Sequence, residues 1–488
     1  MTSPPFAALP TRPTTNTPPL HIWLLYALAV LGYALLGRWW QIENIPTDIH
    51  LLAVGVAALS GYPFARWYAQ GRPGLPIFEL ICLVYGLAFS VPLYTLPNSI
   101  LIESQVIPLS WEMLQRALVL VGLGLGTLIA SYRVFQTALR RVPRCDLPLS
   151  ATQLSRYIVF ALAIGGGITF LSTLGLLERL GQVGALLRIG TLQLNIGIVL
   201  LTYGLERNIL PTSPWRTVLG ATLLGSVVLG LATGLLENAV VPVVLMVVMR
   251  WYTRRHVPWA WVVGGLLIFA TFNQAKIAYR DQAWYGGDYV SIPGRISIWA
   301  TEVQEVMGGA QSEATQTTSS DAVQNVTNRF DLLHRFAYVL TLTPRYVPYF
   351  DGETYGYLVY GWIPRVVWAD KPSVALTLDR VDVAYNLKRP GDTYVIGVGQ
   401  LPEAFINFGV LGIVLVMAIQ GGLFALLHQV FDGPNSVGGR AIVVAVLVFF
   451  LNGVGTAAII FWASLVQTLV ANVLIIRYWM QHNANDTA

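Results

Sequence analysis

Long apolar runs separated by short polar connections recur along most of the chain. A run of about 17 to 25 apolar residues is long enough to cross a hydrocarbon core about 30 Å thick as a helix. The pattern predicts twelve spanning helices, at 20–37, 50–65, 76–96, 115–132, 157–177, 185–205, 216–235, 239–251, 258–277, 402–427, 440–456 and 458–476. We therefore predict an all-α, polytopic membrane protein with about twelve transmembrane helices.

One long polar interval, from about 279 to 400, interrupts this pattern. It divides the chain into a disordered tail at 1–19, nine spanning helices at 20–278, a large external loop at 279–400, three further spanning helices at 401–477, and a short tail at 478–488. The first 19 residues are polar and rich in Pro and Thr, which is not the pattern of a signal peptide.

The distribution of Lys and Arg predicts the orientation of the helices. If the N-terminus is cytoplasmic, fifteen arginines fall on the cytoplasmic side and five basic residues fall in short external loops and helix ends. The positive-inside rule then places both termini in the cytoplasm and the polar interval outside. The ten basic residues of that interval do not count against this orientation, because long loops are exempt from the rule.

The composition agrees with a membrane protein and excludes several other classes. Hydrophobic residues make up 55% of the chain and charged residues 11%, whereas soluble domains carry about 25% charged residues. The net charge of +5 is spread over many loops, so we expect a lipid bilayer and no nucleic acid as partner. Neither Cys82 nor Cys145 lies in the polar interval, which excludes a disulfide framework or a cysteine metal site there.

The external loop has three parts. Residues 293–307 place apolar side chains at helical spacing and predict an amphipathic helix lying on the membrane. Residues 308–324 are rich in Gly, Ser, Thr and Gln, which is typical of a flexible lid or a disordered segment. A second amphipathic helix is predicted from Val326 to Leu340, ending before Pro344.

Polar residues within the predicted helices gather at their external ends. Such groups are costly in a membrane, so their depth is informative. Those in external halves or turns are Arg188, Gln193, Asn195, Glu237, Asn238, Asn273, Gln274, Lys276, Glu403 and Asn407, whereas the inner halves hold mainly Glu79 and Gln467. This distribution favours an external active site over a transport channel.

The loop has ten basic and thirteen acidic residues, so anion binding there would depend on individual arginines, whose planar guanidinium groups suit phosphate. Several could instead pair with carboxylates, as Asp331 with Arg335 and Asp379 with Arg380. His334 is the only histidine of the loop and is either a half-buried packing residue or a general base. We expect no metal, because no second histidine or cysteine lies near it.

The stretch from Arg345 to Pro372 concentrates arginines, carboxylates and aromatic residues between prolines and glycines. Its segment GWIPRVVWADKP, residues 361–372, resembles the Ile-Pro-Arg, Trp, Lys-Pro signature of Wzy-type polysaccharide (O-antigen or exopolysaccharide) polymerases. The sequence GVGQLPEAFINFG, residues 397–409, is similar to the segment by which those chains re-enter the membrane, and RYVPYFDGETYG, residues 345–356, fits an arginine–ten residues–glycine pattern. The plan of about twelve spans with one large external loop is also similar.

The resemblance implies a glycosyltransferase of the bacterial inner membrane that works on the periplasmic face. It would join undecaprenyl-pyrophosphate-linked glycans without a cofactor, alongside a flippase and a chain-length regulator. On that basis, the expected residues are Arg280, Arg345, Arg365 and Lys371 for pyrophosphate, His334, Asp370 and Glu403 as candidate bases, and Tyr355, Tyr360, Trp362 and Trp368 for sugar rings. Two alternatives remain open, namely an O-antigen-type ligase and a transporter or flippase of lipid-linked glycans.

Overall fold

The computed structural model describes residues 20–71, 74–102, 105–177, 184–254, 259–283, 290–308, 327–328, 330–363, 367–368, 370–372, 374–389, 396–432, 436–446 and 453–482. Within these residues the regular structure is helical apart from one short antiparallel hairpin, β1 (Ser99–Ile102) and β2 (Gln105–Pro108), in which Ile100 lies opposite Ile107. The predicted all-α class is confirmed.

The helices follow one another along the chain with short connections. Before the polar interval, the helices are α1 (Leu20–Trp40), α2 (Thr47–Ala69), α3 (Ile77–Ser90), α4 (Pro92–Thr95), α5 (Trp111–Ala138), η1 (Leu139–Arg141), α6 (Ala151–Thr173), α7 (Gly184–Glu206), α8 (Thr212–Ala232), α9 (Leu236–Arg254) and α10 (Trp259–Ala283). The remaining helices are α11 (Ile292–Gly308), α13 (Leu333–Leu342), α14 (Glu353–Gly356), η3 (Tyr357–Val359), α15 (Val374–Ala384), α16 (Gln400–Phe431), α17 (Val437–Ala445) and α19 (Ala458–His482).

Ten of the described helices are long and apolar enough to cross a membrane. They correspond to ten of the twelve predicted spans. Of the two others, the span predicted at 258–277 lies almost wholly within the 25-residue helix α10. The span predicted at 440–456 differs, because it is represented by the nine-residue α17, followed at 453–457 by a turn into α19. Residues 447–452, between them, lie outside the described residues.

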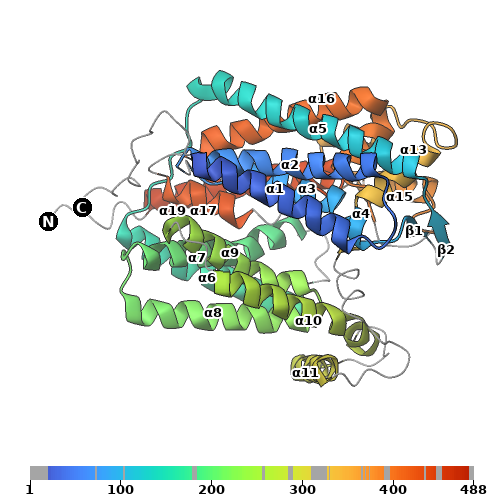
Figure 1. Ribbon diagram of the computed structural model, residues 1–488. Helices are drawn as coiled ribbons and strands as arrows, with labels where there is room; N and C mark the ends of the chain where they lie inside the picture. The colour runs from blue at the N-terminus through green and yellow to red at the C-terminus, as the bar shows by residue number, and fades with distance from the viewer. Residues whose placement is uncertain are drawn as a thin grey trace.

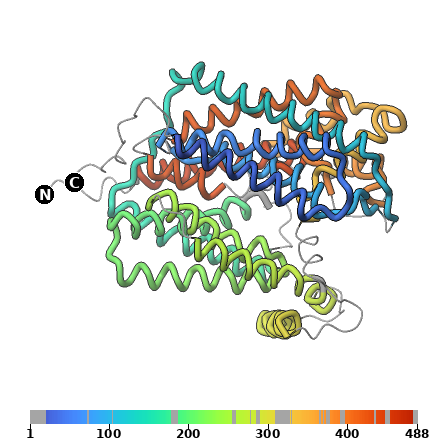
Figure 2. Tube along the Cα trace, viewed as in Figure 1, coloured from blue at the N-terminus to red at the C-terminus, as the bar shows by residue number. Residues whose placement is uncertain are grey.

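The long helices form two groups that lie side by side (Figure 1). One group contains α1, α2, α3, α5 and α16, and the other contains α6 to α10. The helices α17 and α19 lie between the groups, and α17 packs against both α7 and α9. Figure 2 shows the same two groups as a continuous trace.

The two ends of the bundle differ in what they carry. One end carries β1, β2, α13 and α15 and is called the loop end below (right in Figure 1). The opposite end, where α1 begins and α19 ends, is called the terminal end. At the terminal end, Gln153 Nε2 at the start of α6 donates to Met480 O in the last turn of α19 at 3.3 Å. The start of α6 and the end of α19 therefore lie on the same side of the bundle.

Both helices predicted in the external loop are present. The helix α11 lies across the direction of the bundle and is seen end-on below α10 in Figure 1. Its Trp299 stacks on Tyr279 of α10 with ring centroids 4.4 Å apart and donates from Nε1 to Leu231 O at 2.9 Å. These contacts fix α11 on the end of α8 and α10. The low-complexity part, 308–324, lies outside the described residues except for Gly308, which ends α11.

The second loop helix begins later and lies deeper than predicted. The helix α13 starts at Leu333 and ends at Leu342, before Pro344 as expected. However, seven of its ten residues are buried, because it is inserted among α3, α5 and α16 rather than lying on a surface. Its start is tied to α3 by a hydrogen bond from Leu332 N to Ala88 O. Part of the external loop is therefore a packed element of the bundle.

The span predicted at 402–427 is divided into two segments. Phe408 and Gly409 have non-helical backbone angles, with φ of +63° at Gly409, so the helix breaks within α16. The segment before the break folds back along the segment after it, and Gln420 Nε2 consequently donates to Gln400 Oε1 at 2.6 Å. The second segment, 410–431, is about 33 Å long, which is long enough to cross a membrane by itself. The first segment, 400–407, is a short helix that enters the bundle without crossing it.

Candidate functional site

The re-entrant segment 400–407 meets the turn between α17 and α19. Gln400 N donates to Val454 O at 3.2 Å, and the Gln400 side chain donates to Gly453 O. Three residues later, Glu403 Oε2 accepts a hydrogen bond from Ala458 N, the first residue of α19, at 2.6 Å. The approach is close, since a Cβ on Gly399, which has φ of +89°, would lie 3.1 Å from Val454 O. The turn at 453–458 is thereby fixed against the re-entrant segment.

Glu403 has one carboxylate oxygen that the fold does not satisfy. The residue is 1% exposed, and in the described part of the chain no hydrogen bond reaches Oε1. The Tyr355 hydroxyl of α14 is likewise buried and lacks a hydrogen-bond partner among the described residues. Burial, and then the charge of Glu403, raise the pKa of Tyr355 far above its usual range. Unsatisfied buried polar atoms are rare in native proteins and require an explanation.

Asn407 positions α14 over this carboxylate. Its Oδ1 accepts from Gly352 N at 3.0 Å, and its Nδ2 donates to Thr354 Oγ1 at 2.9 Å. The Thr354 hydroxyl in turn lies beside the Glu403 carboxyl group. The re-entrant segment and α14 therefore form one hydrogen-bonded unit around Glu403.

A polar cavity of about 390 Å³ opens in the loop-end half of the group formed by α6 to α10. Its polar lining comes from α6 to α9, from the turn at 453–458 and from α19, and comprises Thr169, Ser172, Thr173, Arg188, Thr191, Asn195, Ser226, Thr233, Glu237, Asn238, Thr456 and Ser464. Arg188 Nη1 donates to Ser464 Oγ at 3.3 Å. Gly453 and Thr456 line the cavity, while the backbone of the same turn bonds to Gln400 and Glu403. One turn thus separates the cavity from the buried carboxylate.

This cavity agrees with the polar residues singled out in the sequence. Arg188, Asn195, Glu237 and Asn238 were expected at the external ends of their helices, and all four line this one cavity. The structure adds the hydroxyl groups of α6, α8 and α19. They carry no distinguishing signal in sequence, since Ser and Thr are common in membrane helices, where they bond to their own backbone.

The aromatic stretch after α14 is anchored on α19. Gln467 Nε2 donates to the carbonyls of Gly361 at 3.1 Å and Trp362 at 2.7 Å. Tyr360 contacts Trp368 with ring centroids 5.6 Å apart. Trp362 and Trp368 are 49% and 41% exposed, whereas Tyr360 is half-buried. Two of the four predicted sugar-binding residues are therefore exposed, whereas Tyr355 lies beside Glu403.

The three described residues among those predicted to bind pyrophosphate, Arg280, Arg345 and Lys371, make separate contacts. Lys371 Nζ donates to Gly361 O at 3.0 Å and Ile363 O at 2.7 Å, so it shapes the aromatic stretch. Arg345 is exposed and lies over the ring of Tyr346. Arg280 belongs to α10 in the other helix group and donates to Gly234 O at 3.4 Å. Arg365 lies outside the described residues.

The predicted bases and ion pairs are also rearranged. His334 is fully buried rather than half-buried, and its Nδ1 lies 3.0 Å from Asp331 Oδ1, which also accepts from His334 N. Arg335 donates to Gly397 O at 3.4 Å instead of pairing with Asp331. Asp370 is exposed. Of the three candidate bases, Glu403 alone combines burial with an unsatisfied oxygen atom.

The expected pair of Asp379 with Arg380 is replaced by two longer-range pairs. Asp379 pairs with Lys388, and Arg380 pairs with Glu353 of α14. Neighbouring residues of a helix point about 100° apart, which explains why the two side chains separate.

Sequence reasoning did not identify Asp382 of α15. Its carboxylate is fully buried and accepts hydrogen bonds from Ile396 N at 2.8 Å and Gly397 N at 3.1 Å. Burial raises its pKa, although these two hydrogen bonds and the Lys388 charge act in the opposite direction. Asp382 thereby fixes the backbone that leads into the re-entrant segment.

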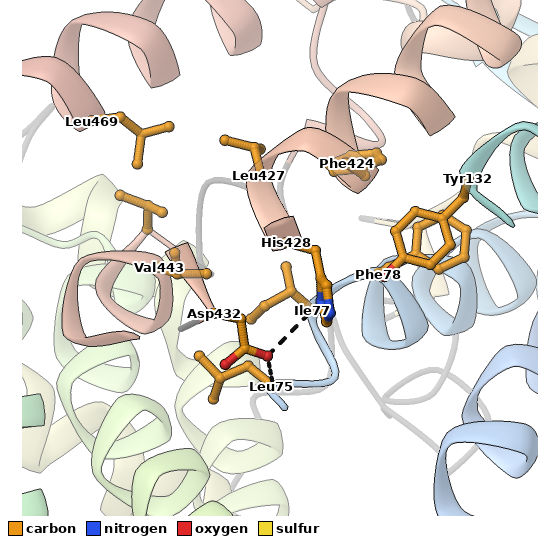
Figure 3. Close-up of a pocket in the computed structure, with 11 residues that line it drawn as sticks. Leu75, Ile77, Phe78, Tyr132, Phe424, Leu427, His428, Asp432, Val443 and Leu469 are labelled. Carbon is orange, nitrogen blue, oxygen red and sulfur yellow. Dashed lines mark hydrogen bonds and ion pairs between the residues drawn. The ribbon is translucent and has the colours of Figure 1, made fainter. Parts of the chain in front are cut away.

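A smaller cavity at the terminal end has a different character (Figure 3). Its walls are mostly apolar, and its volume of about 20 Å³ holds about one water molecule. Asp432 at its edge accepts from Leu75 N at 2.9 Å and pairs with Arg440 Nε at 3.1 Å, with His428 Nδ1 3.9 Å away. These contacts fasten the connection before α3 to the end of α16. The cavity is too small for a sugar or lipid headgroup.

Comparison with known proteins places the candidate site within one family domain. The model of a family described as a domain of unknown function, DUF8712, matches residues 158–481. This range contains the polar cavity, the aromatic stretch and the re-entrant segment. No curated protein and no solved structure matches the chain.

Proposed function

The chain belongs to the DUF8712 family, and we propose that it polymerises polyprenyl-pyrophosphate-linked oligosaccharide repeat units at the periplasmic face of a bacterial inner membrane. The observation that carries this proposal is the pairing of a polar cavity with a buried, incompletely bonded carboxylate across the turn at 453–458. The helix α19 connects them to the aromatic stretch, because its Ser464 lines the cavity and its Gln467 holds Gly361 and Trp362.

In this proposal the cavity receives the donor. Arg188 lies in the first turns of α7, where the positive end of the helix dipole adds to its own charge. A guanidinium group there would bind the pyrophosphate by charge-assisted hydrogen bonds and stabilise it as it departs. The amide groups of Asn195 and Asn238, with the hydroxyl groups of the lining, suit the hydroxyl groups of a sugar.

Glu403 is the proposed general base. Because Glu403 is buried and does not line the cavity, the turn at 453–458 must move aside for the acceptor sugar to reach it. The hydroxyl of the acceptor sugar then attacks the anomeric carbon, the bond from that carbon to the pyrophosphate oxygen breaks, and the hydroxyl proton passes to Glu403 Oε1. The pyrophosphate leaves on its lipid, so the step needs neither a nucleotide nor an oxidant. The oxygen without a hydrogen bond, Oε1, is the atom available for the proton. The other, Oε2, holds the carboxylate in place through Ala458 N.

Reconstitution of the purified protein with a lipid-linked repeat unit tests this assignment. The wild type should form a ladder of lipid-linked oligomers. Glu403→Gln keeps an acceptor for Ala458 N and should fold, but it should lower the rate about 100-fold or more. Arg188→Gln should raise the substrate concentration needed. Arg116→Gln removes an exposed charge of α5 away from the cavity and serves as the control.

A transporter of lipid-linked glycans is the second candidate, and one observation favours it. A second polar cavity lies at the terminal end of the same helices, α7 to α9. The two cavities are separated by an apolar cluster that includes Leu194, Ile198 and Met246, which would act as a closed gate. Movement of labelled substrate across the vesicle membrane without any ladder, unchanged in Glu403→Gln, would assign transport and reject the polymerase. A ladder from repeat units alone would reject a pure ligase.

A further inference from the structure

The cavity at the terminal end has a chemistry of its own. It has a volume of about 480 Å³ and lies between the end of α7, the start of α8 and the end of α9. Its lining consists of Thr202, Leu205, Glu206, Asn208, Arg216, Leu219, Met246, Arg250 and Arg254. Three arginines and one carboxylate therefore face the same space, which leaves two positive charges in excess.

Glu206 forms ion pairs with two of these arginines and cannot neutralise the charge of all three. It pairs with Arg250 Nε at 3.4 Å through Oε1 and with Arg254 through Oε2. Arg216 reaches the cavity from α8, is exposed, and makes no recorded ion pair within the described residues. Since guanidinium groups form paired hydrogen bonds with phosphate oxygens, converging arginines in a concave site suit a phosphate group.

The surroundings of the cavity indicate a lipid as the source of that phosphate. The helices α7, α8 and α9 each contain a segment long and apolar enough to cross a membrane, and the cavity lies where these segments end. The ends of helices that span a bilayer meet the lipid headgroups. Leu205, Leu219 and Met246 give it an apolar inner wall. Toward the middle of α8, Leu224 is 66% exposed, which leaves a face along which acyl chains can lie.

We propose that this cavity binds the phosphate group of an anionic phospholipid, with Arg216, Arg250 and Arg254 contacting the phosphate and Glu206 competing with it for the last two. Basic pockets between membrane helices are suited to such headgroups. The site lies at the opposite end of the bundle from Glu403 and does not depend on the reaction catalysed.

Binding of phosphatidylglycerol to the purified full-length protein in detergent tests the proposal, with phosphatidylcholine and inorganic phosphate as comparison ligands. The wild type should prefer phosphatidylglycerol. Arg216→Gln should weaken its binding about five-fold, and it breaks no ion pair within the described residues. Glu206→Gln should strengthen binding, because it removes the competing carboxylate. This gain could not result from misfolding. Arg141→Gln, an exposed arginine of η1 outside the cavity, is the charge-matched control.

Preference for phosphatidylglycerol that falls in Arg216→Gln, rises in Glu206→Gln and stays unchanged in Arg141→Gln would support the site. Equal binding of the two lipids by the wild type, or an equal loss in Arg216→Gln and Arg141→Gln, would overturn it. Saturable binding of inorganic phosphate that Arg216→Gln abolishes, without a preference between the lipids, would reject the lipid and assign a soluble phosphate compound.

Discussion

Gln400 and Gln420 are twenty residues apart in one helical run, yet Gln420 Nε2 donates to Gln400 Oε1 at 2.6 Å. A straight helix would separate them by about 30 Å. The contact exists because the chain reverses direction at Phe408 and Gly409, so that the first segment of α16 packs beside the middle of its second segment. This reversal places Glu403 inside the bundle and against the first residue of α19. The candidate site therefore depends on one backbone break.

Replacing Gly409 by Ala should weaken this reversal. Gly409 has φ of +63° and ψ of −147°, a region essentially restricted to glycine. A Cβ there would lie 3.1 Å from the Tyr349 hydroxyl. We expect a loss of about 1–3 kcal/mol in the free energy of unfolding, measured as a lower midpoint of thermal unfolding in detergent. Gly126→Ala, whose Cβ would meet nothing within 4 Å, is the control, and an equal effect in both variants would contradict the argument.

The buried amide pair should show energetic coupling. Gln420→Leu removes the donor to Gln400 Oε1 and leaves that oxygen unsatisfied, which should cost about 1–3 kcal/mol. Gln400→Leu should cost at least as much, because it also removes the donor to Gly453 O. The double variant should lose less free energy of unfolding than the sum of the two single variants, because it has no amide side chain left at this contact without its partner. Thermal unfolding of the four proteins measures the coupling, and strict additivity would show that the contact contributes nothing.

Asp382 should give the loop a characteristic dependence on pH. Because burial raises its pKa above the unfolded value of about 3.9, its contribution to stability is fully present below about pH 3.9 and is lost as pH rises through the folded pKa. The difference in unfolding midpoint between the wild type and Asp382→Asn should therefore shrink as the pH rises above about 4. A difference that widens over this range would show that the two backbone hydrogen bonds to the carboxylate dominate instead.

Trp368→Ala should weaken substrate binding without removing the reaction. Its ring is 41% exposed and in contact with Tyr360, which suits stacking on a sugar face. On the scale of aromatic contacts, the loss should raise the half-saturating substrate concentration about two- to ten-fold. The maximal rate should be retained. Trp39→Ala, at an 81% exposed position in α1, is the matched control; a similar change there would indicate a general effect on the membrane interface.

Much of the fold could be predicted because spanning helices leave a local signal. Length and apolar content of single runs predicted the ten spans, and helical spacing predicted α11 at almost its observed bounds. The end of α13 before Pro344 follows from the same kind of information, since proline cannot continue a helix. Local patterns do not specify how deeply a helix is buried, which is why the amphipathic pattern of α13 did not predict that it is inserted among other helices.

The candidate site could be predicted only in outline. Arg188, Glu237 and Glu403 stood out because charged residues in membrane helices are rare. Gln400, Gln420 and Asp382 did not stand out, because each is distinguished only by its hydrogen-bond partner. Gln400 and Gln420 bond to each other across the reversal in α16, and Asp382 bonds to backbone N–H groups fourteen and fifteen residues later. In the same way, Asp379 and Arg380 are adjacent in sequence but pair with Lys388 and Glu353.

By itself, the sequence determined the class of this protein, the positions of most spanning helices and the end of the bundle at which polar residues gather. Each of these depends on short stretches of chain that must satisfy their own backbone in lipid. Only the tertiary structure decided that α16 reverses, that Glu403 meets Ala458, and that two polar cavities lie at opposite ends of α7 to α9. The physical reason is that a cavity or a buried carboxylate is defined by atoms from several helices, and no local pattern specifies which helices meet.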